Sequence, residues 1–248
     1  GCLKGIQEYL PPQIQIRFSS KNKTKMNKRS IALLTGFALI LMAISGGFSM
    51  GFALAEFTGK NLDLGLKENL IFNQGLYKIM LFGLGITIAL DFLVSYGLYR
   101  FFQDDHKKLA QLSGVLRLIY TLIFGFAAIF LFRNLNLDKS TNEMIWANYQ
   151  CFQLIWNSGL VIFGFHILSI AFLMKLHQKV PRLLWNITFI AGFSYIGISI
   201  LKVIQEDSEL ADSLQMILAL PMIVGEVGLA LWLIIKGGKK ATAKLESQ

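Results

Sequence analysis

Long apolar runs alternate with short polar segments along most of the chain. Each of six apolar runs has the roughly 20 residues that a helix needs to cross about 30 Å of hydrocarbon. None shows the period-two alternation of barrel strands, so the backbone groups must be satisfied within helices. The pattern predicts an all-α integral membrane bundle of six transmembrane helices, at about residues 31–55, 77–99, 112–132, 152–174, 183–203 and 214–235.

The composition and the aromatic positions agree with a bilayer protein. The 248-residue chain is 54% hydrophobic and 16% charged, with 20 Phe against 4 Pro. Such values are typical of chains that lie mostly in lipid. The Trp residues fall mostly near the ends of the apolar runs, which predicts an interfacial belt of Trp146, Trp156, Trp185 and Trp232.

The N-terminal part divides into a polar segment and the first apolar run. Residues 1–25 precede "MNKRSIALL", which resembles a natural start at Met26, so we interpret 1–25 as a leader or added extension, disordered or cytoplasmic. A cleaved signal peptide is an alternative, because Ala53 and Ala55 form an A-x-A pattern. The run is longer than the roughly 7–15 residues of a signal peptide, which favours a retained span. Residues 26–238 then form the six-helix domain, and 239–248 form a basic cytoplasmic tail.

The formal charge of +9 is explained by topology. Lys and Arg concentrate before the first span and after the second, fourth and sixth, whereas the last loop on the other side carries Glu206, Asp207, Glu209 and Asp212. By the positive-inside rule, both termini should be cytoplasmic. No basic stripe interleaved with aromatics lies in a soluble domain, so we expect no nucleic-acid partner.

Four ionisable residues lie within the apolar runs: Asp91, Arg117, His166 and Glu226. Counted from the proposed cytoplasmic ends, all four lie at a depth of roughly 8–14 Å. They come from four helices of alternating direction, so this agreement is not a trivial result of sequence proximity. Small or polar residues share the helical face of each, which predicts that the four point inward as one buried layer in the cytoplasmic half.

The four residues allow structural and functional interpretations. Asp91 and Arg117 lie on helices joined by a short turn and can form a buried lock, or Arg117 could bind an anionic substrate group. Burial favours the neutral form of a carboxylate and of an imidazole. Both Glu226 and His166 would then gain or lose their proton at a pH closer to neutral, which suits proton exchange. A packing role is the alternative for both. Tyr195 lies on the polar face of the fifth span, and these five residues are the candidates for binding or proton handling.

Pro221 and two glycines mark a special segment beside Glu226. Pro221 lacks a backbone donor, while Gly225 and Gly228 allow close approach of another helix or a ligand. The segment predicts either an ordinary proline bend or a hydrated opening.

Enzyme signals are absent from the sequence. It contains no HExxH, GxSxG or GxxxxGK[ST] motif and no metal-spaced Cys/His set, so we expect no catalytic residues, no metal and no cofactor. Cys2 and Cys151 are far apart and predict no disulfide framework. An intramembrane enzyme acting on lipid is the least favoured function.

Several segments together resemble a known family: "DFLVSYGLYRFF", "GVLRLIY", "GFHIL", "VPRLLWNITFIAGFSYI" and "GEVGLALWLIIKGG". In this order they are similar to the bacterial multi-pass membrane family catalogued as domain of unknown function 4386, over roughly Lys28 to Gly238. The resemblance implies a bacterial cytoplasmic (inner) membrane location. The positions that match the family pattern are Asp91, Leu98, Tyr99, Arg117, His166, Pro181, Arg182, Tyr195, Glu226 and Trp232. Pro181 is expected to have a structural role. Trp185 stands where the family pattern has Gly, which puts close packing at the start of the fifth span in doubt.

Two functions compete. In the first, a transporter-like protein handles a small molecule or proton through the buried cluster, and a water-accessible cavity should lie in the cytoplasmic half. In the second, the same charges are interhelical glue in a module that binds a membrane partner or forms a homo-oligomer, and the cluster should be dry and fully paired. Two carboxylates against one Arg leave unbalanced charge, which favours the first.

Overall fold

The computed structural model describes residues 27–58, 65–136, 140–205 and 209–239. This part of the chain is all helical, without a strand. Six helices are long and apolar enough to cross a membrane. The elements are α1 (Lys28–Gly46), the π-helix η1 (Gly47–Ala53), α2 (Leu54–Thr58), α3 (Leu66–Phe72), α4 (Gln74–Phe102), α5 (Lys107–Arg133), α6 (Asn142–Leu176), α7 (Arg182–Ile204) and α8 (Glu209–Ile235).

The all-α bundle of six apolar helices is confirmed, with two differences in detail. The helix α6 begins at Asn142, well before the predicted start at 152, because polar residues continue the helix beyond the apolar run and the Thr141 hydroxyl accepts from Met144 N at 3.3 Å. The short helix α3 was not predicted. The interpretations of residues 1–25 and of the tail beyond residue 239 fall outside the described residues.

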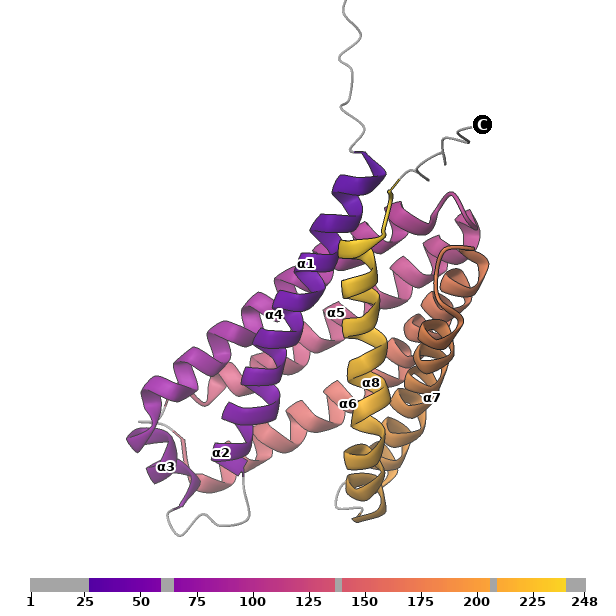
Figure 1. Ribbon diagram of the computed structural model, residues 1–248. Coiled ribbons are helices and arrows are strands. Elements are labelled where there is room, and N and C mark those ends of the chain that lie inside the picture. Colours follow the sequence, from indigo (N-terminus) through magenta and orange to yellow (C-terminus); the bar gives the residue numbers. More distant parts are fainter. Residues whose placement is uncertain (1–26, 59–64, 137–139, 206–208, 240–248) are drawn as a thin grey trace, which may run out of the picture.

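The six long helices form a closed ring in chain order. Each packs against its neighbours in sequence, and α8 returns to pack against α1 (Figure 1). Gly36 permits the closing contact, because a Cβ there would lie 2.9 Å from the Ala230 carbonyl oxygen of α8. Arg29 adds to it by donating to carbonyl oxygens of Leu233 and Gly237 at the end of α8, at 3.1 and 2.8 Å.

The outer surface of the ring is apolar. Phe37, Phe82 and Phe193 are 60%, 70% and 65% exposed. In water such a surface would be an aggregation hazard, whereas in a bilayer it is the expected lipid-facing side.

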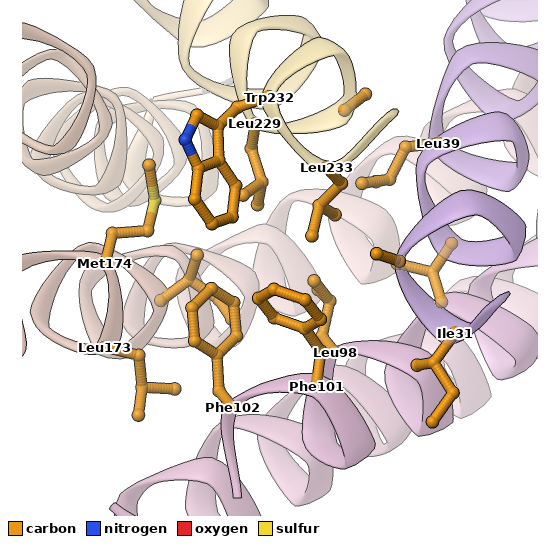
Figure 2. Close-up of a cluster of buried hydrophobic side chains, with 14 of the residues drawn as sticks. Ile31, Leu39, Leu98, Phe101, Phe102, Leu173, Met174, Leu229, Trp232 and Leu233 are labelled. Carbon is orange, nitrogen blue, oxygen red and sulfur yellow. The ribbon is translucent and has the colours of Figure 1, made fainter. Parts of the chain in front are cut away.

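Inside the ring, two apolar clusters lie at opposite ends of the bundle. One cluster lies at the end of the bundle where α1 begins and α8 ends, which we call the terminal side. It contains Phe101, Phe102, Leu229, Trp232 and Leu233, and we call it the terminal plug (Figure 2). The cluster at the opposite side includes Phe57, Tyr77 and Leu131. The polar layer predicted from the sequence lies between these clusters.

Candidate binding site

Asp91 and Arg117 meet in the middle of the bundle. Arg117 Nε and Nη2 both donate to Asp91 Oδ1, at 2.9 and 2.5 Å, and the two residues are only 2% and 1% exposed. Their contact follows from the turn between α4 and α5, which makes these helices antiparallel neighbours. The pair satisfies two buried charges that would be costly to leave alone.

His166 completes this arrangement and is held by both ring nitrogens. Arg117 Nη1 lies 3.1 Å from Nε2, while Nδ1 lies 2.9 Å from both the hydroxyl and the carbonyl oxygen of Ser113. Arginine can only donate, so Nε2 must accept and the proton must lie on Nδ1, where it is donated to Ser113. His166 is therefore neutral in this arrangement and orients Arg117.

Glu226 is bonded to Tyr195, the candidate on the polar face of the fifth span, and not to the other three charged residues. Tyr195 Oη of α7 donates to Glu226 Oε1 of α8 at 2.5 Å. Tyr195 in turn packs edge-on against Phe163, with ring centroids 5.0 Å apart. The predicted layer thus divides into an Asp91–Arg117–His166 triad and a Glu226–Tyr195 pair.

A cavity of about 420 Å³ lies beside both groups. All six long helices contribute to its wall, and Asp91, Arg117, Tyr195 and Glu226 are among the lining residues. His166 does not line it. The volume lies within the roughly 300–1,000 Å³ of small-molecule sites.

The cavity extends away from the termini. It reaches Lys202 in the last turn of α7 and Gln215 near the start of α8. On the terminal side the space next to the polar layer is filled by the terminal plug (Figure 2). The sequence predicts a cavity in the half of the bundle that carries the terminal plug. The cavity lies on the other side of the polar layer, because the bulky rings of Phe101, Phe102 and Trp232 occupy the terminal side.

The cavity also reaches the lipid-facing surface between α1 and α8. These helices meet at the terminal side and diverge from there (Figure 1). Ala43 of α1 and Ile223 of α8 both line the cavity and are exposed. A ligand could thus enter from the bilayer as well as from water.

Several residues of the wall were not predicted as site residues. Tyr120, Trp156, Asn157 and Phe163 line the cavity. Trp156 Nε1 is buried and has no hydrogen-bond partner among the described residues. The interfacial interpretation is wrong for Trp156 and for Trp232, which is 5% exposed in the plug and donates to the Lys179 carbonyl oxygen at 3.2 Å.

The proline and glycine candidates shape the helices around the site. Pro181 is the N-cap residue of α7, and Pro221 lies inside α8. At Gly225 a Cβ would lie 3.3 Å from Ala191 Cβ, and at Gly228 it would lie 2.6 Å from Leu184 Cδ1. Both glycines therefore serve the close packing of α7 on α8.

Trp185 lies at the edge of the terminal plug. It packs there partly buried, with Lys175 Nζ 5.5 Å from a ring centroid. No group of three His, Cys, Asp or Glu among the described residues could hold a metal ion.

Comparison with known proteins relates the chain to an archaeal protein and to a family, neither with a described function. The chain is 27% identical over 164 residues to a protein of Archaeoglobus fulgidus named only as uncharacterized, covering 66% of this chain and 86% of that protein. No solved structure matches. The model of the family described as a domain of unknown function (DUF4386) matches residues 34–237, and the chain belongs to this family.

Proposed function

We propose that the protein handles a small molecule or a proton at the cavity, with Glu226 as the exchanging group. The observation that carries the proposal is the cavity of about 420 Å³, which reaches the polar layer from the side opposite the terminal plug. One-sided access to a charged site in the middle of the membrane is the arrangement that carriers use.

The hydrogen bonds give the triad and Glu226 different roles. Asp91, Arg117 and His166 satisfy one another and serve as a fixed scaffold. Glu226 receives one hydrogen bond from the neutral Tyr195 and faces the cavity, so it can gain or lose a proton without breaking the triad.

The proposal includes an orientation and a location. Basic residues gather at the terminal side, with Arg29, Arg100 and Arg182 near the ends of their helices. The positive-inside rule favours cytoplasmic termini in a bacterial cytoplasmic membrane. The cavity would then face the outside of the cell.

The first experiment measures water access to the cavity by thiol labelling. In a chain with Cys2→Ser and Cys151→Ser, a cysteine is placed at Ser199, which lines the cavity, or at Ser194, which does not. Both serines lie on α7 and are buried, at 2% and 5% exposure, so they are a matched pair. A membrane-impermeant thiosulfonate is added from the side opposite the termini, with a cysteine at the exposed Gln215 as positive control.

We expect Ser199→Cys to react and Ser194→Cys to stay protected. Proteoliposomes containing a pH-sensitive dye should then show proton flux that Glu226→Gln abolishes. Protection of Ser199→Cys while Gln215→Cys reacts would mean a dry cluster, and would favour the structural or partner-binding module instead.

A further inference from the structure

Four charged residues line the cavity, and Glu226 differs from the other three because it has no ion-pair partner in the described part of the chain. Asp91 is neutralised by Arg117, to which it is bonded twice, and Lys202 at the far end is paired with Asp212 at 3.2 Å. Glu226 is bonded to the neutral hydroxyl of Tyr195. When Glu226 is ionised, it is therefore the charge of the cavity lining that has no ion-pair partner among the described residues.

Aromatic rings lie on the same wall. Tyr120 and Phe163 have ring centroids 4.6 Å apart, and Tyr195 continues this row beyond Phe163. Trp156 adds a fourth ring to the lining. The negative face of such rings attracts cations within about 6 Å.

Most of the remaining wall is apolar and adaptable, with Thr87, Asn157, Ser199 and Gln215 as polar exceptions. Leu39, Met42, Leu160, Ile198, Met222 and Val227 line the cavity. Methionine side chains fit ligands of varied shape, and the gap between α1 and α8 gives a lipophilic ligand a path from the bilayer. A carboxylate, aromatic faces and an apolar wall together select a ligand that is both lipophilic and positively charged.

We propose that the cavity binds lipophilic organic cations, with the positive charge at Glu226 and the apolar body against Tyr120, Trp156 and the aliphatic wall. This inference rests on the proposed function and names its ligand class. The cation and a proton compete for Glu226, so binding of one displaces the other.

The probes are radiolabelled tetraphenylphosphonium and tetraphenylborate, which have nearly the same shape and opposite charge. Binding is measured by equilibrium dialysis with the full chain in detergent micelles, after subtraction of binding to empty micelles. We expect saturable binding of the cation and at least roughly tenfold weaker binding of the anion. Equal binding of both ions, or binding of neither, would overturn the proposal.

Variants of two glutamates on α8 locate the charge. Glu226→Gln should weaken tetraphenylphosphonium binding by roughly tenfold or more, whereas Glu209→Gln, at the exposed start of the same helix, should leave it unchanged. Unchanged binding in Glu226→Gln would also overturn the proposal. Should that variant misfold, the cation and anion comparison in the unaltered chain still decides.

Competition with protons gives an independent readout. The titratable and charged groups that share these cavity walls with Glu226 are Asp91 of α4, Arg117 and Tyr120 of α5, His166 of α6, and Tyr195 and Lys202 of α7, and α1 contributes none. Cation affinity should fall as the pH falls, and this dependence should disappear in Glu226→Gln. A pH-independent affinity in the unaltered chain contradicts the exchange at Glu226.

The two proposals fail in different ways. If Ser199→Cys is labelled but tetraphenylphosphonium does not bind, the proposal of a hydrated, proton-handling cavity stands and only the proposed ligand class is refuted. If Ser199→Cys is protected and tetraphenylphosphonium does not bind, both the proposed function and the proposed ligand class are refuted.

Discussion

At the scale of single residues, the buried ion pair should dominate stability. Replacing Asp91 by Asn leaves the Arg117 guanidinium charged and without its counter-ion, which costs about 3–5 kcal/mol of unfolding free energy for buried pairs. The measurement is reversible unfolding of the purified protein in mixed micelles. Asp104→Asn is the matched control, because Asp104 is 67% exposed in its pair with Lys28 and should cost about 1 kcal/mol or less. Equal effects of the two variants would contradict a structural lock at Asp91.

The sequence located the four charged residues but not their partners. Depth along a helix follows from residue counts, so Asp91, Arg117, His166 and Glu226 could be placed in one layer. Which side chain each one meets depends on helix rotation and on rotamers, so the Glu226–Tyr195 hydrogen bond could not be predicted. An aromatic residue in an apolar helix has the same sequence signature in a core, at a cavity or at a lipid interface, which explains why Trp156 was misplaced.

At the scale of elements, two glycines of the first span should respond oppositely to alanine. A Cβ at Gly36 would lie 2.7 Å from Ile234 Cγ1 and 2.9 Å from a backbone oxygen of α8, so Gly36→Ala should push α1 away from α8. Gly47 begins the π-helix, and a Cβ there would meet nothing within 4 Å. Alanine is favoured over glycine in helices by about 0.5–1 kcal/mol, so Gly47→Ala should be neutral or stabilising.

Thermal unfolding of the two variants in detergent checks this contrast. Gly36→Ala should lower the melting temperature, and Gly47→Ala should not. A loss of stability in Gly47→Ala that matched Gly36→Ala would mean that the π-helix itself needs glycine, in keeping with the functional role that π-helical turns often have.

The existence and type of the elements were more predictable than their limits. Apolar length alone predicted the six long helices, because a bilayer demands about 20 residues per span. The early start of α6 was missed because polar residues can be helical outside the hydrocarbon layer. The π-helix depends on hydrogen-bond geometry, for which "SGGFSMG" gives no distinct signal.

At the scale of the whole molecule, ring closure decides where the cavity opens. The contact between α1 and α8 joins segments far apart in sequence, and it depends on Gly36 and on the hydrogen bonds of Arg29. Hydrophobic patterns do not specify which helices are neighbours. These patterns could therefore predict the polar layer. They could not predict that side chains fill the terminal side of the layer and that a cavity lies on the opposite side.

We expect the terminal plug to block access of water to the cavity from the terminal side. Trp232 contacts Phe101 and His177, with ring centroids 5.9 and 5.4 Å apart, and removing its indole leaves a void between the polar layer and the terminal side. In Trp232→Ala, a cysteine at Ser199 should become reactive toward an impermeant thiol reagent added from the terminal side. Inverted membrane vesicles and intact cells present the two sides separately. Trp146→Ala, which removes a Trp that is 41% exposed, should leave labelling one-sided. Persistent protection from the terminal side in a folded Trp232→Ala protein would mean that the barrier lies elsewhere, in the Asp91–Arg117–His166 triad itself.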